Sequence, residues 1–369
     1  MTISSPTQSL LDSHWFKLIC GASYQDLPSI RNLALAYALA GADCIDMAAD
    51  TAVVAAVKEG LDTAEGLAKS AGGQWQRSSY ERPLVMVSVS AGEDPHFRKA
   101  WFDASICPTD CKRPCEKICP AAAIAFKPEK SGVIHDRCYG CGRCLPICPY
   151  GLIEARSQPT SLDAIAPKVL TQANALEIHT HVGQQQAFFE LWQTIQPWIG
   201  HLQLISISCP DGEHLIAYLK TLQQIMGAPF QGADDQSVSK PILIWQTDGR
   251  PMSGDIGRGT THAAIRLAQK VLAAELPGYV QLAGGTNQHT VDKLRELGLL
   301  SSPDPTLETR RPTVSGIAYG SFARSLLMSV LEQNHYLEEV PHALQTAVTL
   351  AESLVMPLKQ AAIGPPLAQ

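Results

Sequence analysis

The sequence predicts an α/β fold, a (β/α)8 barrel of the TIM type, with a small cysteine-rich module inserted after its third strand. Short β-rich runs alternate with helical patterns on both sides of residues 100–155, and eight such runs can be counted. Eight of the eleven cysteines lie between positions 107 and 148. Eight βα units in about 250–300 residues are typical of this barrel. The alternative is two α/β halves flanking the module, because periodicity alone does not distinguish a closed barrel from two smaller sheets.

Three strands are expected before the module and five after it. The predicted strands are 17–21, 43–48 and 84–90, then 176–180, 202–208, 242–247, 279–283 and 316–319. Asp26, Pro28 and Gly41 suit the cap, first turn and end of a helix after the first strand, and a second helix follows Asp50. Later helices are expected at 184–197, 212–226, 260–276, 288–298 and 322–354, the last with a clear 3.6-residue apolar rhythm.

This alternation divides the chain into four parts. Residues 1–100 hold the first βα units, 101–156 the ferredoxin-like module, 157–355 the remaining βα units and 356–369 a flexible, proline-containing tail. Insertion after the third strand places the module at the carboxyl-terminal face of the barrel, where active sites of this fold lie.

Composition limits the function and the compartment. The formal net charge is −6, which argues against nucleic-acid binding because that function needs a basic surface. Residues 1–15 are polar, without the basic start and apolar run of a signal peptide, and no apolar stretch approaches the roughly 20 residues of a membrane span. We therefore expect a cytoplasmic protein, in which clustered thiols indicate metal binding rather than disulfides.

The cysteines form two runs, and the second matches a bacterial ferredoxin. It reads Cys138-x2-Cys141-x2-Cys144-x3-Cys148-Pro149, the spacing at which three thiolates hold one cubane cluster while the fourth ligates the other. The first run is a stretched copy, Cys107-x3-Cys111-x3-Cys115-x3-Cys119-Pro120. Pairing the runs by a pseudo-twofold axis predicts two ligand sets: Cys107, Cys111, Cys115 and Cys148 for cluster 1, and Cys138, Cys141, Cys144 and Cys119 for cluster 2.

Two alternatives concern the metal. Zinc sites use sets of four cysteines, typically in two close pairs, and eight cysteines in two Cys-Pro-terminated runs fit that pattern poorly. The wide gaps of the first run leave open whether cluster 1 is a 4Fe–4S cubane or a 3Fe–4S cluster. Within 107–150 there are seven basic and four acidic residues, and such cations stabilise an anionic cluster or simply form a solvated surface.

A second candidate site lies at the last two predicted strands. Gly284, Gly285, Thr286 and Asn287 follow the seventh strand, and Gly320–Ser321 follow the eighth, with Arg324 in the first turn of the next helix. The loops after these strands often bind phosphate at a helix N-terminus, so a flavin mononucleotide or a sugar phosphate is a candidate ligand. The alternative is that the glycines make tight turns and the polar residues cap helices.

Other strand ends carry weaker signals. His179 and His181 share a face and form a candidate metal pair, but the sequence identifies no carboxylate partner. Cys20 and Cys209 are either redox-sensitive thiols or ordinary buried cysteines, and Cys44 is expected in the core. The loop 248–255 is a candidate lid or an ordinary surface loop.

Three stretches together resemble a known family. They are SICPTDCKRPCEKICPAAAI, DRCYGCGRCLPICPYGLIEA and LICGASYQDLPSIRNLALAYALAGADCIDMAAD, and the resemblance covers essentially the whole chain. The chain is similar to the light-dependent period family of cyanobacteria, a redox-sensing input component of the circadian clock. The resemblance implies iron–sulfur clusters held by the cysteines named above, and complexes with clock proteins that include a histidine kinase.

We therefore expect a redox sensor rather than an enzyme, responding to electron donors or to the quinone pool. The rival hypothesis is an iron–sulfur oxidoreductase that passes electrons to a flavin or substrate at the barrel mouth. A simple electron carrier is the third, but it would leave most of the 369 residues without a role.

Overall fold

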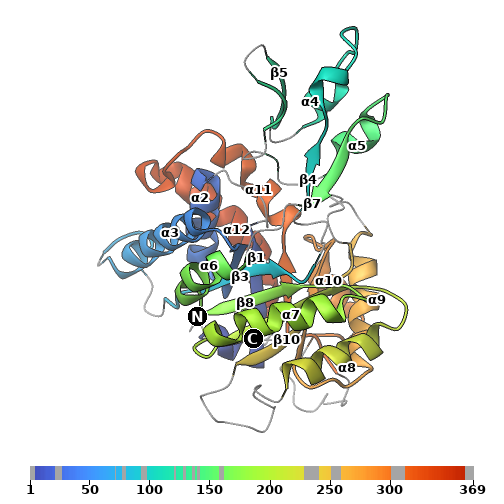
Figure 1. Cartoon of the computed structure of the whole chain (residues 1–369). Coiled ribbons are helices and arrows are strands. Elements are labelled where there is room, and N and C mark those ends of the chain that lie inside the picture. The colour runs from blue at the N-terminus through green and yellow to red at the C-terminus, as the bar shows by residue number, and fades with distance from the viewer. Residues whose placement is uncertain are drawn as a thin grey trace.

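The eight predicted strands form a closed, parallel barrel in the computed structural model (Figure 1). The order around the barrel is β1-β12-β11-β10-β9-β8-β3-β2. The strands are β1 (Trp15–Ile19), β2 (Cys44–Ala48), β3 (Leu84–Ser90), β8 (Ala175–His179), β9 (Leu204–Pro210), β10 (Ile242–Asp248), β11 (Tyr279–Ala283) and β12 (Gly316–Tyr319). The predicted barrel is confirmed, and the alternative of two separate halves is wrong.

The structure describes most but not all of the chain. The described residues are 5–20, 27–70, 72–76, 80–92, 98–119, 122–127, 130–134, 138, 142–157, 162–227, 241–250, 259–300 and 312–361.

Most strands lie close to their predicted positions. Strands β3, β11 and β12 have the predicted bounds, while β1 and β9 are each shifted by two residues. The barrel closes where β1 meets β12, with Trp15 opposite Gly316. A Cβ atom on Gly316 would lie 2.4 Å from the Trp15 carbonyl oxygen, so glycine permits this close pairing. Strand β1 therefore begins at Trp15, earlier than the local pattern predicts.

Helices surround the barrel. They are α2 (Leu27–Ala40), α3 (Thr51–Lys69), α6 (Leu162–Val169), α7 (Gln185–Ile195), α8 (Leu215–Met226), α9 (Thr261–Leu272), α10 (Thr290–Glu296), α11 (Ser321–Leu331) and α12 (Pro341–Ala361). Asp50 caps α3 as predicted, because its carboxylate accepts hydrogen bonds from the amides of Ala52 and Val53. Almost all of α2 is buried, since it packs against α3, α11 and α12.

The predicted single helix at 322–354 is wrong. The helices α11 and α12 are separated by a short 3-10 turn at Leu337–Glu339. Pro341 begins α12, and proline disfavours helical geometry in the residue before it. The side-chain amide of Asn32 also donates to the carbonyl oxygens of Asn334 and His335, at 3.0 and 3.1 Å, which holds the connection in a non-helical path.

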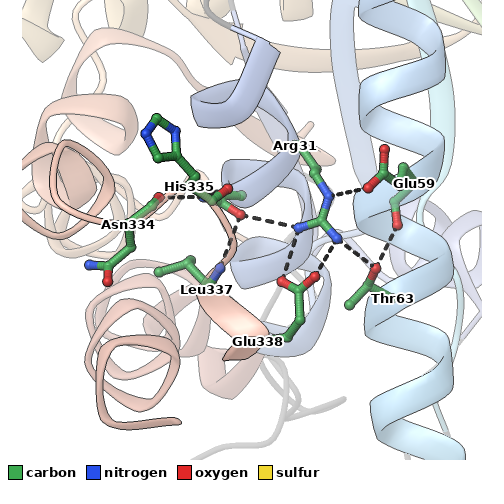
Figure 2. Close-up of polar contacts among 8 residues, drawn as sticks. Arg31, Glu59, Thr63, Asn334, His335, Leu337 and Glu338 are labelled. Carbon is green, nitrogen blue, oxygen red and sulfur yellow. Dashed lines mark hydrogen bonds and ion pairs between the residues drawn. The ribbon is translucent and has the colours of Figure 1, made fainter. Parts of the chain in front are cut away.

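Polar contacts of Arg31 hold the connection between α11 and α12 against the outer helices (Figure 2). Arg31, on α2, donates to Glu59 at 2.7 Å and to Thr63 at 3.1 Å, both on α3. Its guanidinium also forms a fork with the two carboxylate oxygens of Glu338, at 3.0 and 2.5 Å, and lies 4.8 Å from the ring centroid of Tyr336. One buried cation thus joins α2, α3 and the link between α11 and α12.

The chain ends differ from expectation in two places. The predicted flexible tail at 356–369 begins too early, because α12 continues through Pro357 to Ala361. Lys359 anchors this end by donating to Asp43 at 2.5 Å and to Ser9 at 3.1 Å. Residues 362–369 lie outside the described residues. Near the other end, the unpredicted helix α1 (Pro6–Leu11) inserts Leu10 into the apolar layer that closes the amino-terminal end of the barrel.

The cysteine module projects beyond one end of the barrel (Figure 1). Its stalk is an antiparallel pair, β4 (Arg98–Trp101) with β7 (Glu154–Ser157), which follows β3 and precedes α6. The stalk carries α4 (Pro114–Ile118), α5 (Cys144–Ile147) and the hairpin of β5 (Ile124–Lys127) and β6 (Lys130–Val133). The two stalk strands lie at the edges of the predicted 101–156 module, whose exact bounds stay a prediction. Its own small core includes Ala100, Phe102, Ile124 and Ile153 together with three cysteines.

Candidate metal centre

The four cysteines predicted for cluster 1 lie close to one another. The side chains of Cys107 and Cys111 hydrogen-bond, and Cys107 also interacts electrostatically with Cys148. Cys115 interacts in the same way with Cys107 and Cys148. Burial first, and then the neighbouring cysteines, raise the pKa of Cys107 and of Cys115. Four thiolates at this spacing would repel one another, and bound iron removes that repulsion.

Cys148 lies in a turn that presents backbone amides to its sulfur. The amides of Tyr150, Gly151, Leu152 and Ile153 lie close enough to the Cys148 side chain to favour its thiolate. Burial opposes ionisation, but these four donors outweigh it and lower the pKa of Cys148. Gly151 has φ +63°, which lets the chain curl back over the sulfur. Such donors stabilise a thiolate and tune the potential of a cluster that it ligates.

The cysteines predicted for cluster 2 are more enclosed. Cys138 and Cys144 are 8% and 6% exposed and belong to the core of the module, while Cys119 is partly buried. The amide of Ala100 donates to Cys138 Sγ at 3.3 Å, and the amide of Ala123 donates to Cys119 Sγ at 3.2 Å. The fourth predicted ligand, Cys141, lies outside the described residues.

The donor set fits an iron–sulfur group. The seven described cysteines of the module are free thiols, brought together by α4, α5 and the turns beside them. Several of their sulfur atoms accept backbone hydrogen bonds, and Arg113 adds one from its amide to Cys111 at 3.4 Å. Amide donors around thiolate sulfurs are what the outer shell of such a cluster requires.

The glycines of the predicted anion site have a structural explanation. Gly284 and Gly285 have φ +69° and +84°. A Cβ atom would lie 2.0 Å from Asp248 Oδ1 at position 284 and 2.7 Å from the Thr260 carbonyl oxygen at position 285. Only glycine combines this conformation with such close neighbours.

The polar residues beside them already have partners within the protein. Thr286 donates to the carbonyl oxygen of Ala318 at 2.7 Å, and Asn287 donates to Thr260 Oγ1 at 3.0 Å. Gly320 caps α11, and Ser321 Oγ accepts from Arg324 at 3.3 Å. The structure thus brings these residues to the same end of neighbouring strands, and the anion site remains a prediction.

Sequence analysis missed a polar cluster inside the carboxyl-terminal half of the barrel. Lys17 is fully buried and forms ion pairs with Glu177 and, at 3.5 Å, with Asp46. Gln246 donates to Glu177 at 2.7 Å, and Ser88 donates to Asp46 at 2.5 Å. The remaining contacts of this Lys17 cluster extend through Gln281 to the indole of Trp15 and from Gln246 to Ser208.

The ionisable groups of the Lys17 cluster have perturbed pKa values. Burial raises the pKa of Asp46 to about 6, with Lys17 opposing the shift and Glu177 adding to it. Burial also disfavours ionised Glu177, but Lys17 and His179 together hold the pKa of Glu177 well below its usual range. The two carboxylates raise the pKa of Lys17 despite its burial. The cluster therefore holds a lysine cation against Glu177, while Asp46 titrates near pH 6.

The sequence contained a signal for this cluster. Five strands each carry a buried polar residue where a barrel core is usually apolar: Lys17, Asp46, Glu177, Gln246 and Gln281. His179 does have a carboxylate partner, contrary to the sequence analysis, because its Nε2 lies 3.1 Å from Glu177 Oε1.

Other candidate residues lie at or near strand ends, and among them Cys20 is next to the cluster, since its amide donates to the Asp46 carbonyl oxygen at 2.8 Å. His181 contacts the Val182 carbonyl oxygen through Nδ1 at 3.2 Å. Cys20 and Cys209 are buried, and burial raises the pKa of each thiol to about 12, which favours ordinary buried cysteines over reactive thiols. Cys44 lies in the apolar layer as predicted. Of the predicted 248–255 lid, only 248–250 lies within the described residues.

Comparison with known proteins identifies the family. Residues 107–159 match the LdpA Fe-S cluster-binding domain, and residues 169–357 match the Light dependent period A C-terminal domain. The protein named Light dependent period A from Synechococcus elongatus is 53% identical over 369 residues, covering 99% of this chain and 96% of that protein. The chain belongs to the Light dependent period A (LdpA) family.

Relatives outside the LdpA family match short segments of the chain. The electron transport protein HydN of Escherichia coli K12 is 36% identical over 56 residues, which cover 15% of this chain and 32% of that protein. An iron-sulfur protein of Rhodospirillum rubrum is 30% identical over 80 residues, covering 20% of this chain and 42% of that protein. Among solved structures, the tryptophan synthase alpha chain of Legionella pneumophila aligns over 96% of this chain and 98% of its own, at 10% identity and a TM-score of 0.43.

The match of residues 107–159 to the LdpA Fe-S cluster-binding domain shows that the cysteine module is an iron–sulfur cluster-binding domain. No helix in the part of the chain that the structure describes has both the length and the apolar character needed to cross a lipid bilayer.

Proposed function

We propose that this LdpA-family protein is an iron–sulfur redox sensor that carries two 4Fe–4S clusters and reports the redox state of the cell to the circadian clock. One observation carries the proposal: the stretched first run and the ferredoxin-type second run supply four thiols that lie together, Cys107, Cys111, Cys115 and Cys148. Cys148 comes from the second run, as the crossed pairing of a two-cluster ferredoxin requires.

The same crossed pairing supports a second cluster. Cys119 comes from the first run, and its partners Cys138 and Cys144 come from the second, within one small core. Both clusters would then share the turns between α4 and α5, which pack against each other. A cluster of the three-iron type at the first run remains the alternative for cluster 1.

The arrangement suits a sensor because the charge change is confined to a small module on a stalk. When a cluster is bound, it supplies a one-electron change in charge among the cysteine turns. The chain responds through the groups nearest to that change, namely the amides of 150–153 and the guanidinium of Arg113, which lies 4.2 Å from the ring centroid of Phe126. A change in their interactions alters the surface of the module that a partner would contact.

We assign the partners to the circadian clock, including a histidine kinase, and the input to electron donors or the quinone pool. The barrel then serves as the scaffold, in a cytoplasmic protein that binds no nucleic acid. The support is the full-length similarity to a protein whose name describes a light-dependent period.

An iron–sulfur oxidoreductase is the second candidate, and the Lys17 cluster favours it. Buried ionisable groups with shifted pKa values are typical of active sites, and enzymes with this barrel use its carboxyl-terminal end. In that case the clusters would exchange electrons with a flavin mononucleotide or a substrate bound near Gly284–Asn287 and Gly320–Ser321.

Anaerobic purification, followed by iron and sulfide analysis, flavin extraction and EPR during a dithionite titration, separates these functions. The sensor hypothesis expects about eight irons per chain, reduced-cubane signals and no flavin. A three-iron signal in the oxidised protein would change the assignment of cluster 1. Stoichiometric flavin would favour the oxidoreductase.

The clock role needs a separate test. Replacing Cys144 by Ser should abolish the light-dependent adjustment of the period, whereas Cys44→Ser, in the apolar layer of the barrel, should leave it unchanged. An unchanged response in the Cys144 variant, with loss of iron verified, would contradict the sensor proposal.

A further inference from the structure

Exposed apolar side chains are concentrated on the cysteine module. Among the described residues, eight large apolar side chains are exposed, and four of them lie in the module: Ile106, Ile118, Ile147 and Tyr150. Single exposed apolar residues are ordinary, but four within 45 positions of one small domain (106–150) indicate an interaction surface.

Three of the four are next to cysteines of cluster 1 in the sequence or interact with them. Ile106 directly precedes Cys107, and Ile147 directly precedes Cys148. The phenol of Tyr150 lies close enough to Cys107 and Cys148 to interact with both electrostatically. We call Ile106, Ile147 and Tyr150 the cluster 1 face. The fourth residue, Ile118, precedes Cys119 and so belongs to the predicted ligand set of cluster 2.

The cluster 1 face is next to the more accessible set of cysteines. Cys107, Cys111 and Cys148 are partly exposed and Cys115 is buried, whereas among the described cysteines of the other set Cys119 is partly exposed and Cys138 and Cys144 are buried. Electron transfer between proteins needs a short path, so the group held by the first set is the one that a docked protein can reach.

The charge around the module identifies the sign of the partner. Residues 107–150 contain seven basic and four acidic side chains. The rest of the chain contains 22 basic and 31 acidic side chains, which are the totals of 29 and 35 minus those in the module. At the cluster 1 face, Lys112 is exposed next to Cys111 and Arg113 interacts electrostatically with Cys107, while the carboxylate of Asp110 is the main electrostatic neighbour of Tyr150. A bound cluster would add negative charge beneath the surface, but Lys112 and Arg113 outnumber Asp110 at this face, so the surface that a partner meets is apolar at its centre and carries an excess of cations at its edge.

We propose that the cluster 1 face is the docking site for a negatively charged protein that carries single electrons. This inference rests on the proposed function, and it names the kind of protein that supplies the redox signal. In the complex the reduced carrier would lose one electron, and Cys107, Cys111, Cys115 and Cys148 would hold the iron–sulfur group that gains it, so no bond forms or breaks. A small apolar centre with a charged rim suits the weak, short-lived complexes of electron transfer.

Binding of a plant-type 2Fe–2S ferredoxin with net negative charge provides the test. Calorimetry on the cluster-loaded protein would give the dissociation constant at low and at physiological salt. We expect Tyr150→Ser to weaken binding about tenfold, since a central aromatic residue often dominates a small interface. Lys112→Glu should weaken binding and reduce its salt dependence. Ile118→Ser is the matched control, an exposed apolar residue beside the other cluster, and it should change the affinity less than twofold.

Each variant needs its iron content and EPR spectrum measured, so that a weaker complex is not confused with a lost cluster. Equal binding by the Tyr150 variant and the wild type, or equal losses in the Tyr150 and Ile118 variants, would overturn the docking site. Equally tight binding of a positively charged c-type cytochrome would overturn the assigned charge. If the wild type holds its clusters and responds to dithionite but binds no carrier, the docking site is wrong and the sensor proposal stands. If the wild type holds no clusters, the sensor proposal itself fails.

Discussion

Replacing Lys17 by Met tests how the buried polar cluster is stabilised. The Lys17 and Glu177 side chains are fully buried, and Asp46 is 2% exposed, so the variant leaves two carboxyl groups without their cation. Lys17 is the largest of the causes that lower the pKa of Glu177 against the effect of burial. Without it, the buried glutamate is expected to bind a proton in the folded state.

The size of the effect follows from that protonation. Placing a proton at pH 7 on a glutamate with an ordinary pKa near 4.3 costs about 3–4 kcal/mol, at ~1.4 kcal/mol per pH unit. This agrees with the ~3–5 kcal/mol found when one partner of a buried ion pair is removed. The folded variant holds a proton that the unfolded chain has lost above pH 4.3, so its stability falls as pH rises. We expect a loss of ~3–4 kcal/mol at pH 7 that shrinks to about 1 kcal/mol at pH 5.

Urea unfolding followed by circular dichroism at pH 5, 6 and 7 measures this loss. The control is the double variant Lys17→Met/Glu177→Gln, which has no glutamate to protonate and keeps an acceptor for Gln246. It should recover at least about 2 kcal/mol at pH 7 and lose most of the added pH dependence. A single variant as stable as the wild type, or one whose loss is equal at pH 5 and pH 7, would refute this account of the cluster.

Three further predictions concern other sites. Burial raises the folded-state pKa of Asp46 to about 6, so the contribution of Asp46 to stability should decline as pH rises from about 4 to 6. Urea titrations should therefore show the stability of Asp46→Asn rising relative to that of the wild type over this interval. Arg31→Met should lower the free energy of unfolding by about 2 kcal/mol and speed amide hydrogen exchange at 332–340. Glu338→Gln keeps an acceptor for the guanidinium, so it should lower the free energy of unfolding by less than about 1 kcal/mol. Equal exchange rates in both variants and the wild type would contradict the role of Arg31 in holding this connection. Gly284→Ala should lower the free energy of unfolding by at least ~3 kcal/mol, because it combines a positive φ with overlap against Asp248. Gly72→Ala, with φ +72° and open space around it, should lower that free energy by only ~1 kcal/mol. Similar shifts in melting temperature for the two variants would show that the close approach of Gly284 to Asp248 is unimportant.

Most of the barrel could be predicted because each strand is a compact apolar run between turn residues. The sequence does not show where a helix stops when the apolar rhythm continues through the break. Between α11 and α12, Leu331, Leu337 and Leu344 are all buried, so the rhythm suggests one helix. The actual break depends on Asn32, some 300 residues away, and on Pro341, a local signal that could have been used. Helix α1 was missed because so short a segment gives no sign that its one buried leucine, Leu10, closes the barrel.

The candidate site, like the fold, could be predicted only in part. Cysteine spacing predicts ligands because the geometry of a cluster is recorded in local intervals along the chain. The Lys17 cluster has no such record, since Lys17, Asp46 and Glu177 lie on three different strands and meet only when the barrel closes. The glycines after β11 predict a binding site less specifically than the cysteine spacing does. Gly284 and Gly285 are equally suited to binding an anion and to passing close to Asp248 and Thr260, and the second role is the one that the contacts explain.

The Lys17 cluster also bears on the choice between sensor and enzyme. The amino-terminal half of the barrel interior is filled by apolar side chains, among them Leu84, Leu204 and Ile242. An apolar layer would stabilise the other half at least as well, because removing charges from water costs more than a buried ion pair commonly returns. A scaffold alone therefore has no need of these charges. If Lys17→Met/Glu177→Gln is stable and keeps the light-dependent period response, the cluster contributes only to folding specificity, and the sensor depends on the cysteine module alone. If the double variant is stable, retains its iron and loses the response, the barrel interior takes part in the signal, and its ligand or substrate must be sought beside His179.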